Sequence, residues 1–278
     1  MQRPFFIAEI GINHNGDLGI AKRLIDLAKE AGCDAVKFQK RSIDRVYTPE
    51  FLSSARDSPW GKTQRAQKEG LEFGKQAYEA IDAYCRKKGI LWSASAWDTE
   101  SQEFLREFRL PFHKVASAML THLPLLRLIA AEGRHTYIST GMSTIPDIDR
   151  AVEIFRSAGC PFTLLHCVST YPSDEEECNL SVIPSLARRY GCEVGYSGHE
   201  KGMFPTLLAM ALGATAIERH ITLDKAMYGS DQAASLDPEE LRMLMKELDR
   251  VLRIMGGAEK TVSSKEQAIA QKLRYFSG

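Results

Sequence analysis

The sequence lacks a net charge and a hydrophobic run long enough to cross a membrane. Its 36 lysines and arginines balance 36 aspartates and glutamates, so no overall field favours nucleic acid or an anionic membrane. Any anion must therefore be held by a local site. The most apolar stretch, Leu207 to Ile217, is far shorter than the ~20 residues that span a bilayer. A charge interrupts the apolar N-terminal segment, and no small-residue cleavage site follows it, so we expect no signal peptide.

Paired cysteines and a dinucleotide-binding glycine motif are also missing. The six cysteines are scattered, and no two of them form a C-x-x-C motif. We therefore expect reduced thiols in a cytoplasmic protein rather than disulfides or a zinc cluster. No G-x-G-x-x-G follows the first predicted strand, which disfavours the doubly wound open sheet that is the main alternative fold.

What the sequence does contain is a regular alternation of short apolar runs with longer amphipathic ones. Near-continuous apolar runs are typical of parallel strands that are covered on both faces. Strands are predicted at Phe5–Gly11, Ala35–Gln39, Ile90–Ser95, Phe112–Ala116, Thr136–Ser139, Phe162–Cys167, Glu193–Ser197 and Thr215–His220. Helices are predicted at Leu18–Ala31, Glu72–Lys88, Thr99–Phe108, Leu123–Glu132, Ile145–Ala158, Leu180–Arg189, Met203–Leu212 and Pro238–Met255. Eight such units predict an α/β protein with a single (β/α)8 TIM barrel.

The domain organisation follows from the same pattern. Residues 1–257 form the predicted barrel domain, and residues 258–278 form a short polar tail that is helical at most. One connection, Lys40 to Gly70, is far longer than the others and shows no clear helix. Loops of this length in compact domains are usually lids or binding loops, so we expect a lid, with a floppy insertion as the alternative.

Polar side chains stand at the end of nearly every predicted strand. In TIM barrels the βα loops converge at the carboxyl ends of the strands, and catalytic residues lie there. A barrel without a site at that end would finish its strands with small or apolar residues. The polar residues at these ends include Glu9, Lys37, Gln39, Ser95, Lys114, Ser117, Ser139, His166, Ser197, His199, Glu218 and His220.

Two lysines lie within strands, each between apolar neighbours. Lys37 and Lys114 are predicted to be buried, and a buried ammonium needs an anionic partner. One interpretation is that both lysines hold a phosphate or carboxylate of a ligand. The alternative is an ion pair inside the barrel, with Glu9 or Glu218 as the partner.

His199 and His220 end two neighbouring strands and could share one metal ion. With two nitrogen ligands and oxygen donors nearby, Mn²⁺ or Mg²⁺ suits the site better than a structural zinc. Cys167 follows His166 without a second histidine partner, so we interpret this thiol as part of the core.

Several short motifs occur in a fixed order along the chain. Their order and wording closely resemble those of the sialic acid synthase (N-acetylneuraminate synthase) family, and the resemblance covers about Phe5 to Leu236. The motifs are Ala8–Gly16, Val36–Gln39, Lys114–Ser117, Ser139–Met142, Leu165–Cys167, Tyr171–Pro172, Gly195–His199 and Glu218–His220.

This resemblance implies an enzyme, a carbon–carbon bond-forming transferase. It would use a divalent metal to condense phosphoenolpyruvate with an N-acyl amino-sugar aldehyde, giving a nine-carbon 2-keto acid. The implied catalytic residues are Lys37, Lys114, His199 and His220, of which His199 and His220 hold the metal. The implied substrate-binding residues are Glu9, Gln39, Ser95, Ser117, Ser139, Ser169, Tyr171, Ser197 and Asp231. Within this set, Gln39, Tyr171 and Asp231 would face the sugar, and Ser169 stands where some relatives have an asparagine.

Two departures from the family pattern concern the acceptor sugar. Met119 stands where relatives carry a glutamate that contacts the sugar, and the chain ends where relatives continue into an antifreeze-like domain. We expect a homo-oligomer, with a separate partner chain as one way to supply that domain. Two other functions remain open on the same fold. One is an aldolase that forms a Schiff base through Lys37 or Lys114, and the other is a non-catalytic protein that binds phosphoenolpyruvate or a sugar.

Overall fold

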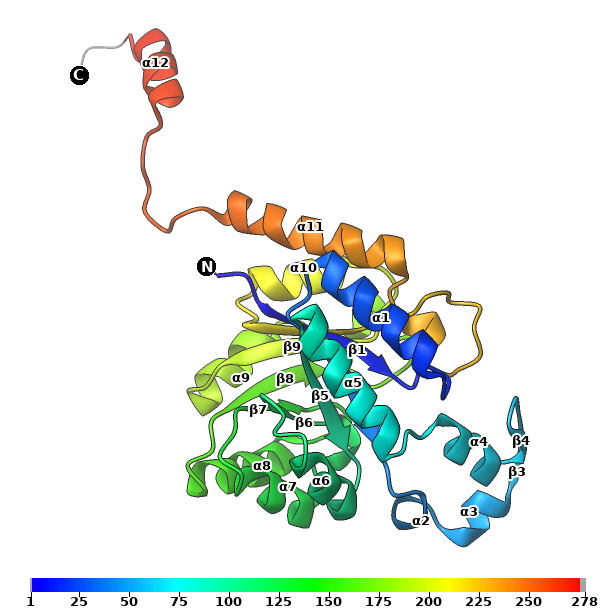
Figure 1. The fold of residues 1–278 in the computed structure, drawn as a ribbon. Coiled ribbons are helices and arrows are strands. Elements are labelled where there is room, and N and C mark those ends of the chain that lie inside the picture. Colours follow the sequence, from blue (N-terminus) through cyan, green and yellow to red (C-terminus); the bar gives the residue numbers. More distant parts are fainter. Residues whose placement is uncertain (1, 276–278) are drawn as a thin grey trace.

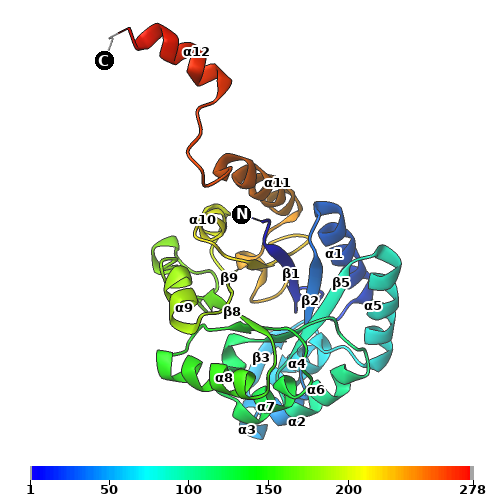
Figure 2. The same cartoon turned by 90° about the vertical axis from the view of Figure 1, so that its left-hand side faces the viewer.

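Eight parallel strands surround a common axis in the computed structural model, which describes residues 2–275 (Figures 1 and 2). Their hydrogen-bonded order is β5-β2-β1-β10-β9-β8-β7-β6. The two end strands, β5 and β6, are joined by the Ser93 hydroxyl, which donates to the Phe112 carbonyl at 2.8 Å. The predicted TIM barrel is thereby confirmed. The strands are β1 (Phe5–Gly11), β2 (Ala35–Lys40), β5 (Leu91–Ala96), β6 (His113–Val115), β7 (Thr136–Ser139), β8 (Phe162–Cys167), β9 (Val194–Gly198) and β10 (Ala216–His220).

Helices cover the outside of this ring (Figure 2), and their ends follow local capping rules. The first helix starts after Asp17, whose carboxylate accepts a hydrogen bond from the Ile20 amide, and it ends at Gly32 with a φ of 88°. The last barrel helix starts with a capping box between Asp237 and Glu240. The covering helices are α1 (Leu18–Ala31), α5 (Lys75–Lys88), α6 (Thr99–Arg106), α7 (Leu123–Ala130), α8 (Ile145–Ser157), α9 (Val182–Tyr190), α10 (Phe204–Ala211) and α11 (Pro238–Met255).

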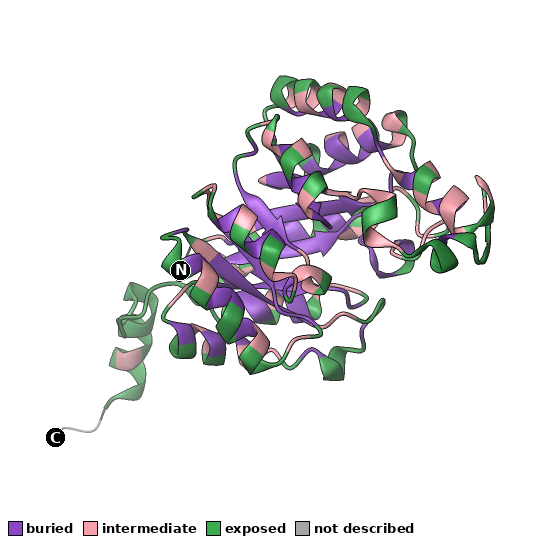
Figure 3. Cartoon of the chain, turned by 90° about the horizontal axis from the view of Figure 1, so that it is seen from below, coloured by how far each residue is buried: buried purple, intermediate pink, exposed green. Residues whose placement is uncertain are grey.

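Alternate residues of the strands point into the barrel, which divides its interior into layers of different character. Near the amino ends of the strands the interior is apolar, with Ile7, Phe112, Tyr137 and Leu165 in one buried cluster. One step further along the strands, the inward residues are charged or polar. Figure 3 shows that the strands are almost wholly buried. The charged layer therefore lies in a low-dielectric interior.

The long connection is not structureless, and this part of the prediction was wrong. Between β2 and α5 the chain forms α2 (Ile43–Val46), α3 (Pro49–Ser53), a hairpin of β3 (Ala55–Ser58) and β4 (Gly61–Thr63), and α4 (Gln64–Leu71). These elements are too short for a periodic sequence signal. Figure 1 shows the insertion beyond the carboxyl ends of the strands, and in Figure 2 β3 and α4 lie behind the ring.

Beyond α11 the chain runs away from the barrel to α12 (Ser264–Leu273; Figure 1). All residues of this helix are exposed except Ala270, which is half-buried (Figure 3). The predicted tail from residue 258 thus contains one short polar helix. Among residues 2–275, no helix combines the length and apolar character that crossing a bilayer requires.

Candidate active site

A cavity of about 180 Å³ opens at the carboxyl end of the barrel, where the predicted site residues converge. All of them line it except Ser95 and Asp231, which lie just outside. The barrel fold explains the convergence, because parallel strands bring residues far apart in the sequence to one rim. The predicted residues that line the cavity are Glu9, Lys37, Gln39, Lys114, Ser117, Ser139, Ser169, Tyr171, Ser197, His199 and His220.

The floor of the cavity is a network of buried charges. Lys37 Nζ lies 2.7 Å from Glu9 Oε2 and 4.0 Å from Glu218 Oε2, and Lys114 Nζ lies 3.4 Å from Glu218 Oε1. Lys37 also donates to the Ser95 hydroxyl at 2.9 Å. The lysines therefore have carboxylate partners from the barrel, as the ion-pair alternative predicted. Ser95 acts here as a support for Lys37.

The two carboxylates of this network differ in their tendency to ionise. Burial raises the pKa of Glu9 to about 7, an effect that the Lys37 ammonium opposes only in part. Burial also acts to raise the pKa of Glu218, but Lys114 and Lys37 outweigh it and hold that pKa below its usual value. Burial lowers the pKa of Lys114. Burial and the neighbouring charges thus shift the pKa values of the two carboxylates in opposite directions.

One wall of the cavity is a cradle of hydroxyl groups around a glycine. The Gly141 amide donates to the Ser117 hydroxyl at 3.2 Å. A Cβ placed on Gly141 would lie 2.2 Å from the Ser169 oxygen and 2.8 Å from the Ser117 oxygen. Within the described part of the chain, the buried Ser139 hydroxyl has no hydrogen-bond partner. Such unpartnered groups are rare in folded proteins, and here they suit the oxygens of an anionic ligand.

The two predicted metal ligands lie next to each other in the lining of the cavity. The ring centres of His199 and His220 lie 5.4 Å apart. His220 Nδ1 is buried and has no hydrogen-bond partner among residues 2–275, and Asp231 Oδ2 lies 3.7 Å from it. Burial lowers the pKa of His220 to about 3, so its ring is neutral and has a lone pair to offer. Asp231, predicted to face the sugar, lies beside this histidine.

This donor set fits a divalent cation with open coordination positions. His199 and His220 are the residues that would hold such an ion, through their ring nitrogens. Within residues 2–275, no three His, Cys, Asp or Glu side chains form a ready-made metal cluster. Further ligands would then have to come from substrate or water, which suits Mn²⁺ or Mg²⁺ better than structural zinc.

Cys167 lines the cavity, which corrects its interpretation as a purely core residue. Its sulfur lies 3.8 Å from His199 Nδ1 and 3.5 Å from the Ser117 hydroxyl. Burial disfavours both the Cys167 thiolate and the His199 imidazolium, but each of these charged groups stabilises the other. The pKa of Cys167 is lowered and that of His199 is raised. The sequence could not show this contact, because it joins two different strands.

Of the other lining residues, Trp97 and Met142 carried no chemical signal in the sequence, whereas Glu218 was already one of the two ion-pair partners proposed there for the lysines. Trp97 and Met142 add apolar surface to the rim, and Glu218 completes the charge network. Met119, at the position where relatives carry a glutamate, is half-buried against the core and is not one of the residues that line the cavity. Met119 therefore packs against the core rather than lining the cavity.

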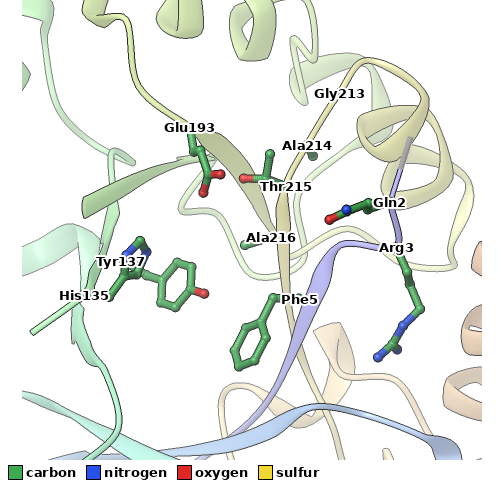
Figure 4. A pocket seen from close by; sticks show the side chains of 10 residues that line it. All are labelled: Gln2, Arg3, Phe5, His135, Tyr137, Glu193, Gly213, Ala214, Thr215 and Ala216. Atoms are coloured by element: carbon green, nitrogen blue, oxygen red, sulfur yellow. The ribbon is translucent and has the colours of Figure 1, made fainter. Parts of the chain in front are cut away.

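A larger hollow of about 580 Å³ lies at the opposite end of the barrel (Figure 4). Its lining includes Phe5, Tyr137, His135 and Glu193. Phe5 and Tyr137 stack at 5.8 Å and close the barrel floor beneath it. Catalytic residues in this fold lie at the other end of the barrel, and His135 and Glu193 of the hollow both bond to the Thr163 hydroxyl. We therefore do not interpret this hollow as a catalytic site.

The fold is a TIM barrel, and its rim brings two buried lysines and a histidine pair into one cavity. The chain belongs to the NeuB family, whose model matches residues 24–260. It is 40% identical to the N-acetylneuraminate-9-phosphate synthase of Homo sapiens, over 98% of this chain and 77% of that protein. It is 36% identical to the N,N'-diacetyllegionaminic acid synthase of Campylobacter jejuni, over 96% of this chain and 82% of that protein.

Solved structures support the same assignment. A crystal structure of N-acetylneuraminic acid (sialic acid) synthetase from Leptospira borgpetersenii superposes with a TM-score of 0.87 at 34% identity, covering 99% of this chain and 94% of that one. A truncated 3-deoxy-D-arabino-heptulosonate 7-phosphate synthase from Thermotoga maritima, at 15% identity and a TM-score of 0.67, shares the fold. The predicted family resemblance and the prediction of an enzyme are confirmed.

Proposed function

We propose that this enzyme condenses phosphoenolpyruvate with an N-acylmannosamine-like sugar aldehyde, releasing a 3-deoxy-2-keto sugar acid and phosphate. One observation carries the proposal: two buried lysines, a hydroxyl cradle and a histidine pair line one cavity. The lysines and hydroxyls could bind the carboxylate and the phosphate of phosphoenolpyruvate. The aldehyde oxygen needs a polarising group close to them. Relatives at 40–42% identity that are named N-acetylneuraminate-9-phosphate synthases support this reaction.

The chemistry assigns distinct tasks to the two sides of the cavity. Carbon 3 of phosphoenolpyruvate attacks the aldehyde carbon, and the aldehyde oxygen takes up a proton. The positive charge that develops on carbon 2 is quenched by water, which loses a proton. The bond between carbon 2 and the phosphate oxygen then breaks, leaving a 2-keto acid and phosphate. Lys37 and Lys114 would stabilise the leaving phosphate, because their ammonium groups are preorganised in a dry site.

The aldehyde group of the acceptor would bind at the histidine side of the cavity. A divalent cation held by His199 and His220 would act as a Lewis acid on the aldehyde oxygen. The hydroxyls of Ser117, Ser139 and Ser169 would orient the enol phosphate, since they border the cavity opposite the lysines' carboxylate partners. Gln39, whose amide already donates to Glu9 at 3.0 Å, would contact the sugar.

Phosphate release tests the proposal directly. The purified enzyme is mixed with phosphoenolpyruvate, Mn²⁺ and a panel of aldehydes that includes N-acetylmannosamine and its 6-phosphate. Release of one phosphate for each 2-keto acid formed supports the condensation. Borohydride trapping of a lysine adduct would instead support the Schiff-base aldolase, for which the lowered pKa of Lys114 is the one favourable observation. Binding without any turnover would support the non-catalytic alternative.

A further inference from the structure

Arg41, the first residue after β2, connects the insertion to the lining of the cavity through the side chain of Gln39. Its guanidinium donates a hydrogen bond to Gln39 Oε1. The other end of the same amide, Gln39 Nε2, donates to Glu9 Oε1 at 3.0 Å. Glu9 in turn lies 2.7 Å from the Lys37 ammonium. A chain of polar contacts thus runs from the start of the insertion to the charged floor of the cavity.

The side chain of Arg41 is itself held in place by its neighbours. Its guanidinium carbon lies 4.0 Å from the ring centre of Trp97, and its Nη1 lies 3.5 Å from Glu72 Oε1. The Arg41 backbone amide donates to Glu72 Oε2 at 3.2 Å, and the Trp97 amide donates to the Lys40 carbonyl at 3.0 Å. Only 10% of the Arg41 side chain is exposed. Arg41 is therefore a fixed support for Gln39 rather than a solvated surface arginine.

Arg41 also decides which way round the Gln39 amide lies. A guanidinium has donors only, so the amide oxygen must face Arg41 and the amide nitrogen must face Glu9. The backbone of Gln39 is fixed as well, since its carbonyl accepts a hydrogen bond from the hydroxyl of the buried Tyr78 at 2.8 Å. A primary amide has two N–H donors and an oxygen with two lone pairs. One donor and one lone pair of Gln39 therefore remain for a ligand in the cavity, in a fixed order.

We propose that Arg41 is a positioning residue, which orients the Gln39 amide for the acceptor sugar. This inference rests on the proposed function, in which Gln39 contacts that sugar. A site with preorganised polar groups discriminates between patterns of hydroxyls, because a misplaced hydroxyl leaves a buried partner unpaired. Gln39 lines the cavity, whereas Arg41 is not one of the lining residues. Arg41 therefore acts on the sugar through Gln39 and not by direct contact.

An anchoring role for Arg41 is the competing explanation. Glu72 directly follows α4, so the contacts between Arg41 and Glu72 also tie the start of the insertion to its end. Lys40 Nζ adds a contact to the same carboxylate at 3.2 Å. Loss of an anchor would loosen the insertion whether or not Gln39 is present. Loss of a positioning residue would matter only while Gln39 is there to be positioned.

The test is a double-mutant cycle of Arg41→Met and Gln39→Met. We expect Arg41→Met to raise the KM for N-acetylmannosamine roughly tenfold, the effect of one well-placed hydrogen bond, and to leave the KM for phosphoenolpyruvate unchanged. In the Gln39→Met background the same substitution should have no further effect. Arg45→Met is the matched control and should leave both KM values unchanged, because Arg45 belongs to the same insertion, is 66% exposed and pairs with Glu100 at 2.6 Å. Additive effects of Arg41→Met and Gln39→Met would support the anchor and overturn the proposal, as would an unchanged KM for the sugar in Arg41→Met.

Crystal structures of the variants add a measurement that needs no turnover. In Arg41→Met the Gln39 amide should turn away from Glu9, so that its Nε2 lies beyond the hydrogen-bond range of about 3.2 Å from Glu9 Oε1. In Arg45→Met this contact should remain. The same contact in Arg41→Met would overturn the positioning role. If wild type neither binds N-acetylmannosamine nor releases phosphate from phosphoenolpyruvate, the proposed reaction fails, and the crystal structures alone decide the role of Arg41.

Discussion

Arg219 Nη1 lies 2.7 Å from Glu200 Oε1, and neither side chain is exposed to solvent. Glu200 directly follows His199, and Arg219 directly precedes His220. The same guanidinium donates to the Thr206 hydroxyl at 2.8 Å and to the Glu200 carbonyl at 2.7 Å. This ion pair therefore ties together the two strand ends that carry the histidines, and it fixes their separation.

Breaking this pair should be costly to stability. Replacing Arg219 with methionine leaves the Glu200 carboxylate buried without its cation, so we expect the free energy of unfolding to fall by roughly 3–5 kcal/mol. Chemical denaturation would measure the loss. Arg189→Met is the control, because Arg189 pairs with Asp149 on the exposed surface and its loss should matter far less. Equal losses in the two variants would show that the buried pair has no special role.

Binding of a divalent cation gives the second prediction. His199→Ala and His220→Ala should each abolish detectable Mn²⁺ binding and turnover without loss of the fold, because each removes one of only two imidazole ligands. Calorimetric titration with Mn²⁺ measures the binding, and circular dichroism checks the fold. His122→Ala is a suitable control, since His122 caps helix α7 away from the cavity. Full activity of chelator-treated wild type would rule out the metal.

The barrel and its rim could be predicted from the sequence because they depend on periodicity alone. β1, β7, β8, α1 and α11 have the predicted bounds. Near-continuous apolar runs mark buried parallel strands, and the convergence of strand ends follows from the fold. That is why polar residues spread over the chain could be placed in one cavity before their distances were known.

Features that depend on contacts between distant segments could not be predicted in this way. The short elements of the insertion are held by tertiary contacts: the Trp60 ring fills the space beside Gly70 and meets the Tyr228 ring edge-on at 5.6 Å. Likewise, the approach of Cys167 to His199 depends on how two strands are placed side by side. Tertiary contacts of this kind override local propensity, and a single sequence does not contain their distances.

Steric blocking of the hydroxyl cradle provides a third prediction. In Gly141→Ala the new methyl group would lie 2.2 Å from the Ser169 oxygen and 2.8 Å from the Ser117 oxygen. Both serine side chains would have to move to make room for it. We expect the Kd for phosphoenolpyruvate to rise at least tenfold, which corresponds to about 1.4 kcal/mol of binding free energy. Calorimetry with phosphoenolpyruvate would measure it. Gly74→Ala is the control, because a methyl group there meets no other atom. Gly159→Ala is unsuitable, because the φ of 62° at Gly159 would strain an alanine. Equal affinity in wild type and Gly141→Ala would remove the cradle from the site.

The last prediction concerns stability in acid and the buried histidine of the first loop. His14 stacks on Phe73 with ring centres 4.0 Å apart, and its Nδ1 accepts a hydrogen bond from the Gly16 amide. Burial, reinforced by the positive charge of Arg41, lowers the pKa of His14 from its usual 6.5 to about 3. Between these values the unfolded chain binds a proton that the folded protein does not, so stability is lost as the pH falls below 6.5.

At one pKa unit per 1.36 kcal/mol, this histidine should account for about 2 kcal/mol of the stability lost between pH 6.5 and pH 5. His14→Gln removes the titrating group, so its free energy of unfolding should fall less steeply over that range than that of wild type, although its value at pH 7 is lower. Comparing the two pH slopes cancels the contributions of the other buried histidines. Parallel slopes would show that His14 is not held neutral by the fold.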